Sequence, residues 1–351
     1  MTIQTDDLRI DEIREVVSPA KLIEDMPVTD TAAETVLNAR TTIQNIMRGT
    51  DNRLLMITGP CSIHDVDAAL EYADRLQDLV EKTKDDLFIV MRVYFEKPRT
   101  TVGWKGLIND PDLDDSYEIN KGLRTARNLL LTLADKGIPA GTEFLDPISP
   151  QYVTDLISWG AIGARTTESQ VHRELASGLS CPIGFKNATD GGLQIAVDAI
   201  LSSSQPHRFL GTTKQGHSAI IATTGNPDCH VILRGGSNQP NYDTANIDAA
   251  AALLEKGGLS NRLIVDCSHA NSFKDHDRQV DVGKEVAAQI ANGEDRIFGV
   301  MLESNLIAGR QNLVDGKAET YGQSVTDACM GWDDTVSVIE NFAEAVKKNN
   351  A

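Results

Sequence analysis

The fold class is indicated by residues 54–93, which read LLMITGPCSIHDVDAALEYADRLQDLVEKTKDDLFIVMRV. Two short apolar runs, Leu54–Thr58 and Leu87–Val93, flank the segment 65–83, whose apolar residues recur three and four positions apart. Such runs are typical of strands buried on both faces, and such spacing is typical of an amphipathic helix. The stretch therefore predicts a strand–helix–strand unit of a parallel sheet.

The same alternation continues along the chain. Helical spacing recurs in 30–48 and 116–136, where Gly137 is expected to end the second helix, and Ser149-Pro150 is expected to start a helix that Gly160 ends. Eight strand–helix units predict a (β/α)8 barrel. A doubly wound sheet is the alternative, but no glycine-rich dinucleotide fingerprint follows the first strand. The predicted strands are Leu54–Thr58, Leu87–Val93, Ile138–Thr142, Ala161–Ala164, Pro182–Phe185, Val231–Leu233, Leu263–Cys267 and Ile297–Leu302.

An extension and an insertion complete the expected organisation. Residues 1–50 are predicted to form an N-terminal regulatory or oligomerisation extension, an extended arm followed by helices, ahead of a catalytic barrel over 51–351. Ser18-Pro19 supplies an N-cap and a first-turn proline for the first helix. The runs His207–Thr212 and Ser218–Thr224 predict a β-hairpin inserted at about 206–225.

The composition narrows the class of function. The 351 residues include 33 Lys and Arg against 51 Asp and Glu, a net charge of −18, which argues against nucleic-acid binding. No uninterrupted apolar stretch approaches the ~18 residues that span a membrane, and the acidic start of the chain lacks the apolar core of a signal peptide. Five widely spaced cysteines do not form a disulfide framework. These features predict a cytoplasmic protein that binds neither nucleic acid nor membrane.

Chemically competent residues stand at the ends of all eight predicted strands. In a barrel these positions converge on one mouth. The basic members, with two more in the loop after the second strand, would bind phosphates or carboxylates, and salt bridges to neighbouring acids are the alternative. The strand-end residues are Cys61, Arg92, Glu143, Arg165, Lys186, Arg234, His269 and Glu303, and the loop residues are Lys97 and Arg99.

Three strand-end residues form a candidate metal site. Cys61, His269 and Glu303 offer sulfur, nitrogen and oxygen, a mixed set that suits a divalent transition metal, and Asp327 could complete four-coordination. These residues have no short ligand spacing, and a buried cysteine is more often a small core residue, so the spacing alone leaves a purely structural role open. Cys329 follows Asp327 by two residues and is expected near Cys61.

A long loop follows the second predicted strand, from Tyr94 to about Ser116. Loops longer than about 12–15 residues in a compact domain are usually functional or disordered. Its basic residues and threonines favour a phosphate-holding lid, and a mobile surface loop is the alternative.

Five longer motifs carry a specific resemblance to a known family. They are Gly59–His64, Met91–Gly106, Gly160–Ser169, Gly184–Asn187 and Asp266–Asn271. They closely resemble the microbial type I 3-deoxy-D-arabino-heptulosonate-7-phosphate (DAHP) synthases, in the branch regulated by aromatic amino acids, and the resemblance covers essentially the whole chain. It implies a (β/α)8 barrel that condenses phosphoenolpyruvate with erythrose 4-phosphate and releases phosphate, the first step of aromatic biosynthesis.

The resemblance also implies roles for individual residues. The ligands of one Mn, Fe, Co or Zn ion per subunit would be Cys61, His269, Glu303 and Asp327, and Lys97 would donate a proton to the new alkoxide. The family suggests a homodimer or homotetramer. The implied contacts to phosphoenolpyruvate are Arg92, Lys97, Glu143, Ala164, Arg165, Lys186 and Arg234, and those to erythrose 4-phosphate are Pro98, Arg99, Thr100 and Asp327.

One position departs from the resembled family. Residue 188 is Ala where the family typically has Gly in Lys-Asn-Gly-Thr-Asp-Gly. Because Ala resists positive φ, this substitution puts the turn after Lys186 in question.

Two other functions remain open at this point. A sister synthase would join phosphoenolpyruvate to arabinose 5-phosphate, but that family resembles Lys-Ala-Asn-Arg-Ser where this chain has Lys97-Pro-Arg-Thr100. A catalytically inactive sensor of an aromatic amino acid is the second alternative. All four ligand positions and the cationic set are present, which argues against it.

The resemblance further implies an allosteric pocket for an aromatic amino acid. The leader Asp6-Asp-Leu-Arg-Ile10 resembles the phenylalanine-sensitive form, whereas Gly211 leaves space for a tyrosine hydroxyl, so phenylalanine is favoured and tyrosine stays open. Packing of the hairpin and a subunit contact are the alternative role. The implied pocket residues are Asp6, Asp7, Pro150, Gln151, Leu179, Ser180, Phe209, Gly211 and Ile221.

Overall fold

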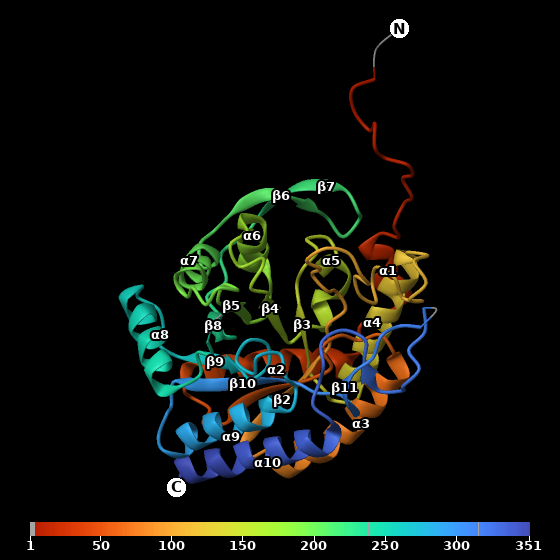
Figure 1. Ribbon diagram of the computed structural model, residues 1–351. Coiled ribbons are helices and arrows are strands. Elements are labelled where there is room, and N and C mark those ends of the chain that lie inside the picture. The colour runs from red at the N-terminus through yellow and green to blue at the C-terminus, as the bar shows by residue number, and fades with distance from the viewer. Residues whose placement is uncertain (1–3, 238, 315) are drawn as a thin grey trace.

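Eight parallel strands close into a barrel, as the sequence predicts (Figure 1). The computed structural model describes residues 4–237, 239–314 and 316–351, so residues 1–3 of the predicted extension lie outside the described residues. Neighbouring strands follow the order β1-β10-β9-β8-β5-β4-β3-β2 around the barrel. The strands are β1 Leu54–Gly59, β2 Leu87–Arg92, β3 Ala140–Glu143, β4 Trp159–Ile162, β5 Ile183–Lys186, β8 Cys229–Leu233, β9 Leu263–Asp266 and β10 Ile297–Glu303.

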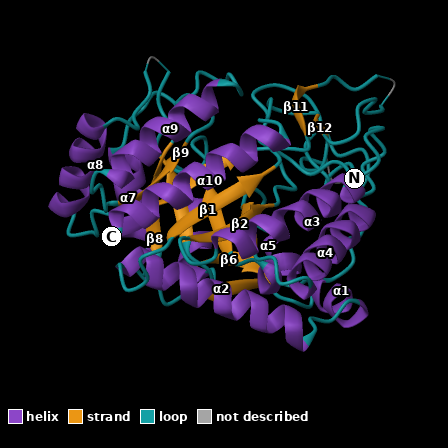
Figure 2. Ribbon diagram, turned by 90° about the horizontal axis from the view of Figure 1, so that it is seen from below, coloured by secondary structure: helices purple, strands orange, loops and turns teal. Residues whose placement is uncertain are grey.

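Helices lie between consecutive strands and cover the outside of the barrel (Figure 2). Their caps explain where several of them begin. Ser18, Thr29 and Asp65 each accept a backbone N–H of the first turn, and Gly49 ends a helix with φ 72°. The helices are α1 Pro19–Asp25, α2 Asp30–Arg48, α3 Val66–Thr83, α4 Ile119–Asp135, α5 Pro150–Val153, α6 Gln170–Gly178, α7 Gln194–Ser203, α8 Thr244–Lys256, α9 Arg278–Ala291 and α10 Trp332–Asn349.

The barrel interior is a separate apolar cluster, and α2 contributes to it. Ile43 and Ile46 of α2 pack with inward-facing residues such as Leu55, Trp159 and Phe298, all fully buried or nearly so. The N-terminal extension is therefore joined to the barrel through a shared core, because these contacts bury apolar surface on both sides.

Two predictions between β3 and β5 are wrong. The expected helix from Ser149-Pro150 to Gly160 ends early: α5 stops at Val153, and a 3-10 turn, η1 (Thr154–Leu156), follows. Gly160 lies within β4, so the strand expected at Ala161–Ala164 begins two residues earlier, at Trp159. A Cβ at Gly160 would approach the Phe144 ring within 2.4 Å. This glycine therefore serves close packing between elements rather than helix termination.

The predicted hairpin is confirmed as β6 (Arg208–Thr212) and β7 (Ser218–Ala222), which pair with each other outside the barrel. Leu210 and Ile220 face each other across the hairpin and are 85% and 77% exposed. The arm before α1 stretches away from the body of the molecule (Figure 1). It carries exposed apolar side chains, including Leu8 and Ile13.

A small sheet of β11 (Ile307–Arg310) and β12 (Gln323–Ser324), which the sequence analysis did not predict, follows β10. In the described part of the chain, no helix combines the length and the apolar run that crossing a bilayer requires.

Candidate functional site

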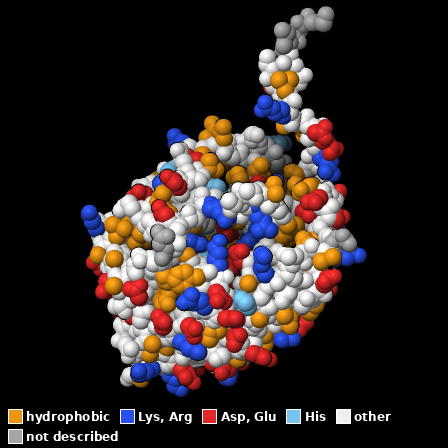
Figure 3. All heavy atoms as spheres, viewed as in Figure 1, with side chains coloured by type: hydrophobic (Ala, Val, Ile, Leu, Met, Phe, Trp, Pro, Cys, Tyr) orange, Lys and Arg blue, Asp and Glu red, His pale blue; other side chains and the backbone are white. Residues whose placement is uncertain are grey.

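The strand-end residues converge on the carboxyl-terminal mouth of the barrel, as predicted. Arg92, Glu143, Lys186 and Glu303 are the last residues of β2, β3, β5 and β10. Cys61, Arg165, Arg234 and His269 follow their strands within one to three residues. Figure 3 shows Lys and Arg side chains around a hollow in the middle of the visible face, while acidic side chains are spread over the surrounding surface.

Three of the four predicted metal ligands lie together. One ligand atom each from Cys61, Glu303 and Asp327 fall within 4.8 Å of one another. His269 stands beside this group, with its Nε2 3.8 Å from Glu303 Oε1. Cys61 and Glu303 are buried and Asp327 is exposed. A thiol, two carboxylates and an adjacent imidazole match the donor set of a divalent transition-metal site.

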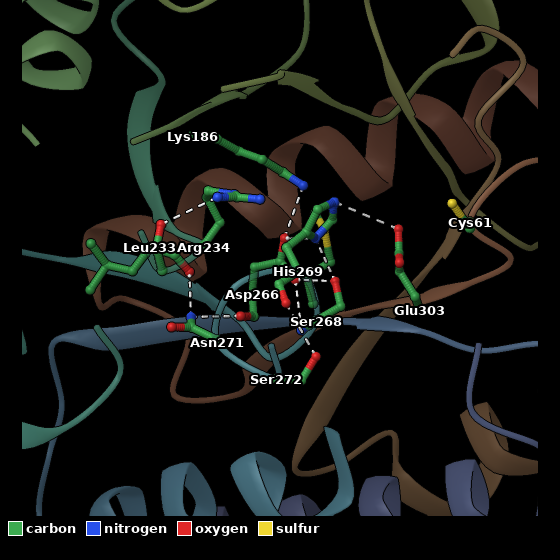
Figure 4. A network of polar contacts seen from close by, with 12 residues as sticks. Cys61, Lys186, Leu233, Arg234, Asp266, Ser268, His269, Asn271, Ser272 and Glu303 are labelled. Carbon is green, nitrogen blue, oxygen red and sulfur yellow. Dashed lines mark hydrogen bonds and ion pairs between the residues drawn. The ribbon is translucent and has the colours of Figure 1, made fainter. Parts of the chain in front are cut away.

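His269 is held by the end of its own strand (Figure 4). Its Nδ1 lies 2.9 Å from Asp266 Oδ2 and 2.6 Å from Ser268 Oγ, and its backbone has φ 55°. A carboxylate on one ring nitrogen fixes the orientation of the other, an arrangement common behind metal-binding histidines. Burial opposes ionisation of Asp266, but His269 and Lys186 hold the pKa of its carboxyl well below its usual range.

Lys97 contacts the candidate metal group directly. Its Nζ donates to Cys61 Sγ at 3.0 Å and to the Cys61 carbonyl at 3.1 Å. Burial and the Glu303 carboxylate raise the pKa of the Cys61 thiol, and the Lys97 ammonium counteracts them. The pKa of Asp327 shows the opposite balance, because Lys97 and His269 lower it against the effect of burial. Lys97 therefore favours the anionic forms that a cation would require.

Arg92 and Glu303 form a buried ion pair between β2 and β10. Arg92 Nη2 lies 2.9 Å from Glu303 Oε1, and both side chains are almost fully buried. Arg92 also donates to the carbonyl of Pro60 at 3.1 Å and stacks 3.4 Å from the centroid of the Tyr94 ring. In the described structure part of the predicted phosphate-binding cluster is thus engaged in ion pairing, as the salt-bridge alternative expects.

Lys186 and Arg234 line the other side of the mouth. Lys186 Nζ pairs with Asp266 Oδ2 at 2.9 Å (Figure 4). Arg234 is buried, and its Nε has no hydrogen-bond partner among the described residues. A buried donor of this kind is available to an anionic ligand.

Glu143 is also buried at the mouth. Gly163 packs against it so closely that a Cβ at residue 163 would lie 2.2 Å from Glu143 Oε1.

The long loop after β2 forms the outer wall of the mouth. Residues 93–118 contain no helix or strand, as predicted, and Arg99 and Thr100 are exposed near its tip. Arg165 is exposed as well, and its Nη1 donates to the Pro98 carbonyl at 2.6 Å. This contact joins the loop after β4 to the long loop and brings two predicted substrate contacts together. Ala164, the remaining predicted contact, is half-buried next to Arg165.

Cys329 lies next to Cys61, as expected. The backbone N–H of Cys61 donates to Cys329 Sγ at 3.3 Å.

The turn after Lys186 accommodates the alanine at position 188. Ala188 does not adopt positive φ, and Gly191 takes φ 107° in that turn instead. The departure at residue 188 therefore does not strain the turn.

A second cavity lies between α5, α6 and the hairpin, with a volume of about 540 Å³. It brings together seven of the nine predicted allosteric residues: Pro150, Gln151, Leu179, Ser180, Phe209, Gly211 and Ile221. Lys214, which donates to the Gln151 carbonyl, also lines it. Asp6 and Asp7 do not line it, because they lie on the arm that points away from the body (Figure 1).

Two residues that organise the mouth, Asp266 and Asn187, had no predicted role. Asp266 ends β9 and holds both Lys186 and His269. Asn187 Oδ1 accepts the backbone N–H of Arg234 at 2.8 Å, which ties the end of β5 to the end of β8. The signal for Asp266 was an acid directly after the apolar run that begins at Leu263. Asn187 gave no signal of its own.

Comparisons with known proteins agree with this geometry. The sequence profile of the DAHP synthetase I family matches residues 26–340. The Phe-sensitive phospho-2-dehydro-3-deoxyheptonate aldolase of Escherichia coli K12 is 58% identical over 347 residues, 99% of each chain. The phospho-2-dehydro-3-deoxyheptonate aldolase of Haemophilus influenzae is 57% identical over 346 residues, 99% of this chain and 96% of the relative. A solved phospho-2-dehydro-3-deoxyheptonate aldolase from Francisella tularensis superimposes with a TM-score of 0.95 at 54% identity, covering 97% of this chain and all of the other.

Proposed function

The chain belongs to the DAHP synthetase I family, and we propose from this how its residues divide the work of the family's reaction. The enzyme condenses phosphoenolpyruvate with D-erythrose 4-phosphate and water, and releases DAHP and inorganic phosphate. This is the first step of the shikimate pathway to the aromatic amino acids. The observation that carries the proposal is the cationic barrel mouth around the Cys61, Glu303 and Asp327 group.

Cys61, Glu303 and Asp327, with His269 as a fourth ligand, would hold one divalent transition metal per subunit. The mixed sulfur, nitrogen and oxygen donors favour Mn, Fe, Co or Zn over Mg. A bound ion supplies a Lewis acid for the aldehyde oxygen of erythrose 4-phosphate. Asp266 keeps the His269 ring turned so that Nε2 faces the group.

The two substrates occupy the two sides of the mouth. Bidentate guanidinium groups and a buried ammonium suit the phosphate and carboxylate of phosphoenolpyruvate. The exposed loop residues suit the phosphate of the sugar. Phosphoenolpyruvate is bound by Arg92, Lys97, Glu143, Ala164, Arg165, Lys186 and Arg234, and erythrose 4-phosphate by Pro98, Arg99, Thr100 and Asp327.

The chemistry then needs positioned charges and one proton donor. The C3 atom of phosphoenolpyruvate attacks the aldehyde carbon, water adds at C2, and the resulting hemiketal phosphate loses phosphate. Arg165, Lys186 and Arg234 stabilise the redistributed charge. Lys97 donates the proton to the new alkoxide, a role supported by its position at 3.0 Å from the proposed ligand atom Cys61 Sγ.

An aromatic amino acid, with phenylalanine favoured, binds in the cavity between α5, α6 and the hairpin and lowers the activity. The cavity lining by Phe209 and Ile221 suits an aromatic ring, and the E. coli relative is named Phe-sensitive. Asp6 and Asp7 stand far from this cavity on their own arm, so they reach an equivalent cavity only when copies of the chain associate. Together with the exposed Leu210 on the hairpin, this supports a homodimer or homotetramer.

The enzyme works in the cytoplasm, which the five free thiols support, because oxidising compartments favour disulfides. It interacts with no nucleic acid or membrane, as its acidic balance suggests.

Phosphate release from phosphoenolpyruvate tests the proposal. We expect release with erythrose 4-phosphate, none with arabinose 5-phosphate, and loss of release after chelation with recovery on adding Mn, Fe, Co or Zn. The variant Cys61→Ser should keep the fold but bind less metal and lose activity. Release with arabinose 5-phosphate alone would favour the sister synthase, and none with either sugar after metal addition would favour an inactive sensor. Wild-type turnover in Cys61→Ser would exclude the proposed metal site.

A further inference from the structure

A buried carboxyl connects the long loop to the segment before α5. Glu96 lies near the start of the loop that follows β2 and is only 5% exposed. Its Oε2 accepts a hydrogen bond from Ser149 Oγ at 2.9 Å, and Ser149 is buried as well. The two residues are 53 positions apart in the sequence, so this hydrogen bond links two loops that are not adjacent along the chain.

Each partner in this contact borders a different site. Glu96 is followed directly by Lys97, whose Nζ touches Cys61 Sγ. Ser149 is followed directly by Pro150 and Gln151, which line the cavity of about 540 Å³. The Glu96–Ser149 hydrogen bond therefore joins two segments: the loop that carries the proposed proton donor Lys97, and the segment at Pro150 that lines the proposed effector cavity.

Both sides of the connection are held in place. The backbone N–H of Ser149 donates to Asp146 Oδ1 at 3.1 Å. On the loop side, the Lys97 N–H donates to the Lys105 carbonyl at 2.9 Å, and a Cβ at Gly106 would lie 2.0 Å from the Phe95 carbonyl oxygen. The backbone on both sides of Glu96 is therefore held by contacts within the loop.

A carboxyl in this position is costly. Burial, with smaller contributions from the carboxylates of Asp146 and Glu143, raises the pKa of Glu96 to about 8, although hydrogen bonds from Ser149 and the Asp146 backbone act to lower it. An apolar side chain of the same size would fold at less cost, because a buried acid gains stability only through its partners. Folding stability alone is therefore a weak reason for a carboxyl at this position.

We propose that Glu96 is a positioning residue with two effects. First, its hydrogen bond to Ser149 holds Lys97 in position for the reaction. Second, the same bond transmits ligand binding in the cavity at Pro150 and Gln151 to the barrel mouth, and this second half rests on the proposed regulation by an aromatic amino acid. Effector binding that shifts the Pro150 segment pulls on Ser149, weakens this bond, and withdraws Lys97 from the mouth.

The test compares variants that keep or lose the bond. Glu96→Gln retains an oxygen that accepts from Ser149 Oγ, whereas Glu96→Leu and Ser149→Ala remove the bond. We expect Glu96→Leu and Ser149→Ala each to lower kcat/KM and to raise the half-inhibitory concentration of phenylalanine, both by about tenfold, the effect of one lost hydrogen bond. Glu96→Gln should restore both values to within about threefold of wild type.

Two controls separate positioning from packing. Ser203→Ala removes the hydroxyl of another fully buried serine, which donates to the Arg173 carbonyl and does not line the cavity, and should change neither value. The double variant Glu96→Leu/Ser149→Ala should match the single variants, because partners in one contact are not additive. Melting temperatures confirm that every variant is folded.

The outcomes discriminate between the two halves of the proposal. Wild-type kcat/KM in Glu96→Leu, equal defects in Glu96→Gln and Glu96→Leu, or additive defects in the double variant would overturn the positioning role. A lowered kcat/KM with unchanged inhibition would overturn the connection to the cavity alone. If wild type responds to no aromatic amino acid, the proposed regulation fails, and the kcat/KM values still decide the role of Glu96.

Discussion

The backbone N–H of Cys61 donates to Cys329 Sγ at 3.3 Å, which places two buried cysteines side by side although 268 residues separate them. A metal on Cys61 would occupy its sulfur, and removing the metal would leave both sulfurs free to react with each other. Burial and the neighbouring Cys61 raise the pKa of the Cys329 thiol, so this oxidation should be slow. We therefore expect chelated protein kept in air to lose two thiols and, with them, the activity that metal addition would restore. Dithiothreitol followed by metal should recover both. A thiol titration over time measures this. Cys329→Ser should be protected, whereas Cys229→Ala, at the first residue of β8 and so at the opposite end of the barrel from the mouth, should not be. Equal loss in Cys329→Ser would show that the two thiols do not pair.

Asp266 should control metal affinity without being a ligand. Its Oδ2 lies 2.9 Å from both His269 Nδ1 and Lys186 Nζ. Asp266→Asn removes the charge that orients the imidazole, and we expect Mn²⁺ binding to weaken about 10–100-fold. Calorimetric titration of chelated protein with Mn²⁺ measures the change. Asp243→Asn, which exchanges one good helix N-cap for another, is the matched control. Unchanged affinity in Asp266→Asn would mean that His269 is held by other contacts.

The space at Gly211 should determine which aromatic amino acid inhibits. A Cβ at this position would lie 2.7 Å from Ile221 Cγ1, so Gly211→Ser narrows the cavity. We expect phenylalanine to inhibit wild type, and Gly211→Ser to weaken inhibition by tyrosine about tenfold more than inhibition by phenylalanine. Dose–response curves for phenylalanine, tyrosine and tryptophan measure both effects. Ala219→Ser, the cross-strand neighbour of Gly211, is the control. The prediction fails if tyrosine inhibits Gly211→Ser as well as it inhibits wild type.

Acid should destabilise the fold through His230. This histidine lies inside the barrel, where its Nε2 accepts from Trp159 Nε1 at 3.2 Å, and burial lowers its pKa from 6.5 to about 3. Below pH 6.5 the unfolded chain binds a proton at this residue and the folded chain does not. Its contribution to stability is therefore complete above pH 6.5 and falls by about 1.4 kcal/mol per pH unit towards pH 3.

Urea unfolding at a fixed protein concentration measures this effect. His230→Gln keeps an acceptor for Trp159 but cannot titrate. Between pH 7.5 and 5.5, wild type should lose about 1.4 kcal/mol more than the variant. Identical losses in the two proteins would show that His230 is not the titrating group.

The sequence predicted the barrel well because the strands are apolar and regularly spaced. All eight predicted strands begin within two residues of the observed ones, and most of them overlap the observed strand over most of its length. The shortest overlap is at β4, where only Ala161 and Ile162 are shared. The errors are concentrated around Gly160, where local sequence is a poor guide. A glycine after a predicted helix indicates a helix end, but here the requirement comes from Phe144, which lies in another segment.

The candidate site was predicted as a set of residues but not as a set of contacts. The ends of parallel strands must converge, so Cys61 and Glu303 could be grouped from the sequence. That Lys186 pairs with Asp266, or that Glu96 reaches Ser149, depends on side-chain directions and distances between loops, which spacing along one chain does not encode. Buried polar partners of this kind are recognised only once the fold is known.

The hairpin of β6 and β7 forms its hydrogen-bond ladder only within itself, apart from the ladder that closes the barrel. Substitutions that reshape it need not disturb the strands that carry the side chains of the barrel mouth. A lineage that descends from this enzyme can therefore change the lining of the proposed effector cavity through this element and still inherit the same barrel mouth.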